Sequence, residues 1–160
     1  MMGSGRTVYC ADTSALIAAW DERYPIGNFP PLWDRIEQLG TVKRLWIPEA
    51  VIDETEKRSK DLNKWLKDRP DIVIGYETDV QQAARQVLAS YPRLVGAKKV
   101  RYAADPFVIA TAHSRGMFVL TEEYPTNSLS RPNIPDVCKD MSVPCATLID
   151  VIRSENWVIG

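Results

Sequence analysis

The sequence has few of the side chains on which thiol, histidine and zinc chemistry depends. Its 160 residues include one histidine, His113, and three cysteines, Cys10, Cys138 and Cys145. The cysteines are odd in number and lack the C-x-x-C spacing of a zinc site or a redox dithiol. We therefore expect the cysteines to be small buried hydrophobes and His113 to be a partly buried helix residue. Catalysis of the Ser-His or Cys-His type has little support in this composition.

A long apolar run and a charge imbalance are also missing. No stretch approaches the roughly 20 apolar residues of a membrane span. The opening segment, MMGSGRTVYC, lacks the apolar stretch of a secretory signal. We therefore expect a cytoplasmic protein without a membrane partner. The formal net charge is −1, so a nucleic-acid partner has to be argued from local basic segments.

The composition that remains is that of a globular protein, with 45% hydrophobic and 26% charged residues. A chain of 160 residues has the size of one domain. We predict a flexible tail over residues 1–6 and a single domain over residues 7–160.

Short apolar runs alternate with stretches of helical periodicity along the chain. Residues 71–76 fit a strand or a loop equally well, and residues 21–29 indicate a loop. The predicted strands are 7–10, 44–47, 117–120 and 143–146, and the predicted helices are 13–20, 31–40, 49–60, 62–67, 78–90, 105–114, 134–141 and 148–155. Strands separated by helices imply crossover connections. The sequence therefore predicts an α/β fold, a three-layer α/β/α sandwich with a mostly parallel central sheet.

Four acidic residues follow predicted strands. Asp12 comes after VYC, Glu54 lies in the helix after RLWI, Asp105 opens the helix ADPFVIATAHSRG, and Glu123 follows MFVL. Ligands bind at the carboxyl ends of parallel strands, where these carboxylates can converge. Carboxylates that lie close together disfavour each other's ionisation, and a bound divalent cation removes this cost. Oxygen ligands select hard ions such as Mg²⁺. Metal-assisted phosphoryl transfer is the chemistry that follows.

Each of these acids also has a plain structural interpretation. Asp105 before Pro106 is typical of an N-cap followed by proline, and Asp12 fits a turn equally well. Glu122 could serve as well as Glu123 as the acid of the site that follows MFVL. In the predicted helix 49–60, three other acids could take the place of Glu54 as the metal ligand, namely Glu49, Asp53 and Glu56. We expect Thr13 or Ser14 to cap the first helix, which would free Asp12 from that role.

Taken together, DTSALIA, IPEAVIDETEK and AADPFVIATAHSRGMFVLTEE resemble the PIN-domain nucleases, which include the VapC-type toxins. The resemblance implies a Mg²⁺- or Mn²⁺-dependent endoribonuclease, often dimeric and held inactive by an antitoxin. It makes Asp12, Glu54 and Asp105 catalytic metal ligands. Glu123 stands at the fourth acidic position, where the family usually has Asp. The loop 21–30 and the segment PPLWDRI suggest a PIN-like subgroup, one with Glu at that fourth position. Ser14 and Thr121 match positions that support the site by hydrogen bonding.

Two basic segments are candidates for RNA contacts. Lys98, Lys99 and Arg101 lead directly into Asp105 without an intervening acid, so we expect them to bind phosphate. The segment 57–69 is diluted by acids, and we expect it to be solvated surface. The aromatic rings considered for stacking on unpaired bases are those of Tyr91 and Tyr102.

Three other functions compete with the nuclease. A phosphatase of the haloacid dehalogenase type needs a second acid two residues after Asp12, where this chain has Ser14. A receiver domain needs paired acids before its first helix and a lysine after a late strand, and neither is evident. A PIN-fold protein that binds RNA or a partner without cleaving remains open because of Glu123. The sequence does not distinguish RNA from single-stranded DNA as the substrate.

Overall fold

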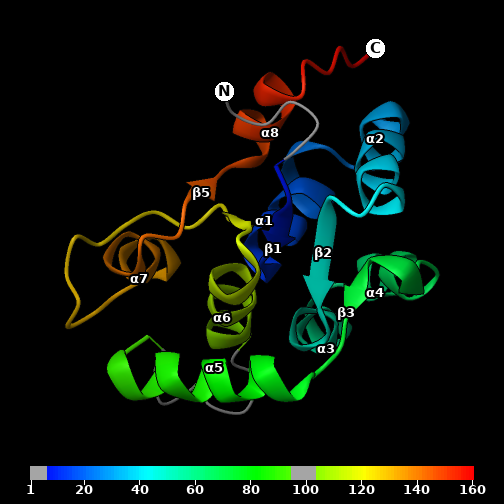
Figure 1. Cartoon of the computed structure of the whole chain (residues 1–160). Helices are drawn as coiled ribbons and strands as arrows, with labels where there is room; N and C mark the ends of the chain where they lie inside the picture. Colours follow the sequence, from blue (N-terminus) through cyan, green and yellow to red (C-terminus); the bar gives the residue numbers. More distant parts are fainter. Residues whose placement is uncertain (1–6, 95–103) are drawn as a thin grey trace.

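The computed structural model of the chain describes residues 7–94 and 104–160, so the tail predicted over residues 1–6 lies outside it. Short strands alternate with helices along the chain (Figure 1). The strands are β1 (Tyr9–Ala11), β2 (Leu45–Pro48), β3 (Val73–Ile74), β4 (Phe118–Leu120) and β5 (Cys145–Ala146). The helices are α1 (Thr13–Ile17), the π-helical η1 (Ala18–Arg23), α2 (Pro30–Thr41), α3 (Glu49–Arg58), α4 (Lys60–Lys67), the 3-10 turn η2 (Pro70–Ile72), α5 (Thr78–Ser90), α6 (Asp105–Arg115), α7 (Ile134–Met141) and α8 (Leu148–Ser154).

The strands form one parallel sheet in the order β3-β2-β1-β4-β5. The central strand is β1, in which Cys10 pairs with Trp46 of β2 on one side and with Val119 of β4 on the other. Parallel neighbours require a crossover connection, and helices supply it between these strands. The α/β fold predicted from the sequence is therefore confirmed. The carboxyl end of β1, which leads into Asp12, lies in the middle of one edge of the sheet.

Alternating side chains of β1 face the two helical layers. The thiol of Cys10 donates to the carbonyl oxygen of Val108 in α6 at 3.7 Å, and α5 and α7 pack against α6. The hydroxyl of Tyr9 points the other way and donates to Glu155, which directly follows α8, at 3.0 Å. Successive residues of a strand point to opposite faces, so the sheet is covered on both.

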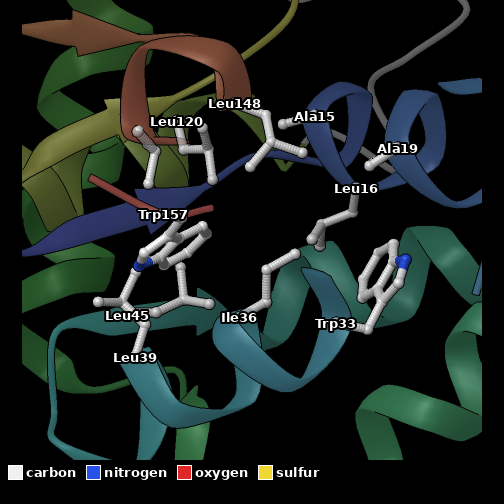
Figure 2. A pocket seen from close by; sticks show the side chains of 11 residues that line it. Ala15, Leu16, Ala19, Trp33, Ile36, Leu39, Leu45, Leu120, Leu148 and Trp157 are labelled. Carbon is white, nitrogen blue, oxygen red and sulfur yellow. The ribbon is translucent and has the colours of Figure 1, made fainter. Parts of the chain in front are cut away.

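The layer formed by α1, α2 and α8 encloses an apolar core. Figure 2 shows Leu16, Ile36 and Leu148 pointing toward one another from these three helices. The cavity between them measures about 20 Å³, which is room for about one water molecule, but its hydrophobic lining offers that water no suitable partners. This face is therefore packed core rather than a ligand site.

A partly buried ion pair closes the amino end of the sheet. Arg44, which precedes β2, binds both carboxylate oxygens of Glu155, at 2.9 and 2.5 Å. The two side chains are only 14% and 7% exposed. Burial and the hydrogen bond to the same carboxylate raise the pKa of Tyr9. The pair joins the segment after α8 to the start of the sheet.

Several local predictions were wrong. Helical structure continues through η1 to Arg23, where we predicted a loop from residue 21. Residues 71–76, for which a strand and a loop were both open, include the short strand β3. Cys145 is exposed because it lies on the edge strand β5, and His113 is exposed in the last turn of α6. No helix in the described part of the chain is long and apolar enough to cross a membrane.

Candidate active site

Asp12 is buried at the carboxyl end of the central strand. Its backbone N–H continues the pairing of β1 with β4 by donating to the carbonyl oxygen of Leu120 at 2.9 Å, and the residue is 1% exposed. Its carboxylate oxygen Oδ1 accepts the backbone N–H of Ala15 at 2.8 Å. Asp12 is therefore the N-cap of α1, and the prediction that Thr13 or Ser14 would cap this helix was wrong.

Two hydroxyl groups fix the orientation of the Asp12 carboxylate. The Ser14 hydroxyl lies 2.9 Å from both carboxylate oxygens, and the Thr121 hydroxyl donates to Oδ2 at 2.6 Å. Thr121 is itself buried and directly follows β4. The hydroxyls of Ser14 and Thr121 therefore both contact the Asp12 carboxylate, and they lie 3.3 Å from each other.

Burial dominates the electrostatics of Asp12. Removal from water raises the pKa of its carboxyl group to about 7, and the negative charge of Glu123 acts in the same direction. The hydrogen bonds from Thr121, Ala15 and Ser14 act against this shift. No lysine or arginine among residues 7–94 and 104–160 forms an ion pair with Asp12. The carboxylate is thus fixed in geometry but not neutralised by a described cation.

Glu54 connects three elements beside Asp12. Its oxygen Oε1 accepts the hydroxyl of Thr13 in α1 at 2.6 Å, and Oε2 accepts the backbone N–H of Ala104 at 3.0 Å. Ala104 directly precedes α6, so the half-buried Glu54 of α3 holds the start of that helix. Its competitors Glu49, Asp53 and Glu56 are exposed. The structure therefore brings Glu54, rather than these acids, toward Asp12.

Asp105 is the first residue of α6 rather than its cap. The N-cap is Ala104, and Asp105 and Pro106 occupy the first two helical positions. The capping interpretation was therefore wrong by one residue. Half-buried Asp105 follows the amide that Glu54 binds, which places both acids at the same edge of the sheet.

Glu123 lies close enough to Asp12 to raise the pKa of that group, but its own carboxylate is engaged elsewhere. Its Oε1 accepts the backbone N–H of Ile134, the first residue of α7, at 3.0 Å. Its backbone N–H donates to Thr121 at 3.1 Å. Glu123 therefore connects the site to α7.

These acids do not form a closed metal cluster by themselves. The described residues contain no group of three or more His, Cys, Asp or Glu side chains arranged to hold a metal ion. Glu54 and Glu123 each direct an oxygen to a backbone amide instead. The chemistry of the donors nevertheless fits a hard cation, because all four side chains offer carboxylate oxygens.

The predicted RNA contacts are only partly covered by the structure. Lys98, Lys99 and Arg101, together with Tyr102, lie outside the described residues. Tyr91 is half-buried, and its hydroxyl donates to Asp140. Three basic residues of the segment 57–69 form ion pairs with acids, namely Lys64 with Asp68, Lys67 with Glu56 and Arg69 with Glu37. These pairs agree with the expectation that this segment is surface.

The sequence did not predict the contacts that two residues make in the site. The buried Thr13 orients Glu54, and the only local signal for this role is a second hydroxyl next to Asp12. Glu122 donates its backbone N–H to Ser14 at 3.1 Å, and its side chain accepts the backbone N–H of Leu148 at 2.9 Å. No spacing rule predicts this second link, because it joins segments 26 residues apart.

Comparisons with solved structures identify the fold. The chain is similar to a chain of DNA-bound VapBC from Salmonella typhimurium, with 18% identity, a TM-score of 0.52, and coverage of 88% of this chain and 98% of that one. It is also similar to a chain of Rickettsia felis VapBC2 bound to a DNA fragment from its promoter, with 14% identity, a TM-score of 0.51 and the same two coverages. The class is therefore an α/β protein with the fold of a chain found in VapBC complexes.

The sequence itself assigns the family. The chain belongs to the family described as Domain of unknown function (DUF4411), whose model matches residues 9–159. No curated protein matches the chain. A PIN-like subgroup marked by Glu at the fourth acidic position stays a prediction.

Proposed function

We propose that this chain is a metal-dependent endoribonuclease that hydrolyses phosphodiester bonds of RNA, and that it is the toxin component of a type II toxin–antitoxin system. The observation that carries the proposal is the state of Asp12, a buried carboxylate at the end of the central strand with a pKa raised to about 7 and no described cation beside it. Perturbed carboxylates at this edge of a parallel sheet are typical of functional sites.

The ligands in this proposal are Asp12, Glu54, Asp105 and Glu123, and the ion is Mg²⁺ or Mn²⁺. When bound, such an ion lowers the pKa of water for attack on phosphorus and stabilises the leaving oxygen. Around it, Ser14 and Thr121 hold the Asp12 carboxylate in one orientation. Binding would require Glu54 and Glu123 to share or release their amide hydrogen bonds.

The partner assignments follow from the same proposal. The similar structures are VapBC complexes, which supports an antitoxin as the partner of this chain. The chain would act in the cytoplasm as a homodimer. Lys98, Lys99 and Arg101 would contact the phosphates of RNA next to Asp105.

The test is cleavage of end-labelled single-stranded RNA by the purified full chain, in EDTA and with Mg²⁺ or Mn²⁺. We expect cleavage only with metal, and at least a hundredfold loss in Asp12→Asn and Asp105→Asn. Asp34→Asn is the matched control, since Asp34 is an exposed acid of α2. Full activity in folded Asp12→Asn would contradict the proposal, as would the absence of cleavage with any metal. Single-stranded DNA of the same sequence tests the choice of RNA.

A second candidate is a PIN-fold protein that binds RNA or a partner without cleaving it. It is favoured by the contact of Glu123 with the first amide of α7, which occupies one oxygen of the fourth acid. RNA binding without cleavage, unchanged in Glu123→Gln, would support this second function.

A further inference from the structure

Tyr124 is an aromatic residue held in solvent beside the candidate site. Its side chain directly follows Glu123 and is 77% exposed. The loop that carries it is fixed by polar contacts, because the Asn133 side chain donates to the Tyr124 carbonyl oxygen at 2.8 Å. The backbone N–H groups of Thr126 and Asn127 both bind Asp136, at 2.9 and 2.7 Å. Packing therefore does not explain the position of this ring.

Arg23 at the end of η1 lies next to the same segment. Its Nη1 binds Glu122 at 2.5 Å, and its side chain remains 50% exposed. Within the described part of the chain, no acceptor is bound to its Nε or Nη2. The hydrogen bond to Glu122 raises the pKa of Arg23. Tyr124 follows two residues after Glu122, the acid that Arg23 binds, and contributes to the shift in the same direction.

A short series of contacts connects Arg23 to Asp12. Glu122 holds Arg23 through its side chain and binds Ser14 through its backbone N–H at 3.1 Å. Ser14 in turn binds the Asp12 carboxylate at 2.9 Å. The guanidinium of Arg23 is therefore fixed relative to the buried carboxylate, and the backbone that carries the Tyr124 ring is held by the contact of Asn133 with its carbonyl oxygen.

We propose that Arg23 and Tyr124 form a subsite for one unpaired nucleotide of a single-stranded nucleic acid, next to the phosphodiester at Asp12. The ring of Tyr124 stacks on the base, and the free donors of Arg23 bind a phosphate oxygen. Bases of a duplex are already stacked, so the subsite selects single strands. The inference rests on the proposed nuclease function, because it places the nucleotide relative to the candidate active site.

The experiment is fluorescence anisotropy of labelled single-stranded RNA in EDTA, with a blunt duplex of the same sequence for comparison. We expect Tyr124→Ala to bind the single strand about tenfold more weakly, whereas Tyr124→Phe retains affinity because it keeps the ring. Arg23→Gln is expected to reduce the salt dependence of log Kd by about 0.7, as loss of one phosphate contact does for single strands.

Two variants serve as controls. Leu129→Ala removes a 48% exposed side chain from the same loop, and Arg35→Gln removes an exposed charge from α2. Neither is expected to change the affinity for RNA. Wild-type affinity in both Tyr124→Ala and Arg23→Gln would overturn the subsite and leave the pair as a surface for a protein partner. Metal-dependent cleavage, assayed separately, would survive that result, so failure of the subsite is distinguishable from failure of the nuclease function.

Discussion

Burial of Asp12 predicts an unusual dependence of stability on pH. The pKa of this carboxyl group rises from its ordinary 3.8 to about 7 in the folded chain, chiefly through desolvation. Between these values the folded chain keeps a proton that the unfolded chain has lost, so the free energy of unfolding falls as pH rises. One pKa unit corresponds to about 1.4 kcal/mol, which gives a total loss of about 4 kcal/mol, of which about 3 kcal/mol falls between about pH 5 and pH 8.

Asp12→Asn removes this contribution, because the amide does not titrate. Guanidinium unfolding in EDTA, followed by tryptophan fluorescence at a series of pH values from 5 to 8, measures it directly. From pH 5 to pH 8, the free energy of unfolding of the variant should rise by about 3 kcal/mol relative to that of the wild type. Hydrogen bonds lost through the substitution lower the stability of the variant equally at every pH and do not change this difference. Asp34→Asn should follow the wild type. Parallel curves for wild type and Asp12→Asn would refute the reasoning.

Three further substitutions test the packing and polar contacts. Thr121→Val should raise the pKa of Asp12 and destabilise the chain by about 1–2 kcal/mol, whereas Thr121→Ser should preserve both, as measured by the same pH series. Glu155→Gln removes the negative charge that the partly buried Arg44 guanidinium binds and should lower the free energy of unfolding by about 2 kcal/mol in denaturant titration. A change no larger than at a surface pair would contradict this. Gly40→Ala places a methyl group 2.1 Å from a side-chain carbon of η2 and should lower the melting temperature despite the better helix propensity of alanine, while an unchanged or higher value would show that η2 moves aside.

The fold was largely predictable because its elements are short and clearly bounded. Thr78–Ser90 and Ile134–Met141 form helices over the same residues that the periodicity indicated. The sheet followed from the spacing, since helices between strands require crossovers. The strand β3 could not be assigned, because two residues carry no measurable alternation. Its pairing with β2 is a long-range contact that local sequence does not encode.

The site was less predictable, because its hydrogen bonds join distant segments. Several hydroxyls near Asp12 could have capped α1 on local grounds. The Thr13 hydroxyl instead donates to Glu54, 41 residues away, and the Ser14 hydroxyl donates to the Asp12 carboxylate. Similarly, Glu123 reaches the first amide of α7, 11 residues away. Residue spacing places an acid at the edge of the sheet, but it does not determine which donor forms a hydrogen bond to that acid.

A comparison within the chain separates a structural carboxylate from a candidate catalytic one. Asp136 and Asp12 both accept backbone N–H groups near helix starts, and both are buried. At Asp136, burial acts to raise the pKa, but the amides of Thr126, Asn133 and Asn127 prevail and lower it. At Asp12, the effect of burial is larger than that of the hydrogen bonds from one amide and two hydroxyls, so the pKa is raised. A carboxylate whose only role was to cap α1 would be stabilised as an anion, as Asp136 is. The raised pKa of Asp12, which no cation among the described residues offsets, therefore supports a further role in binding a cation.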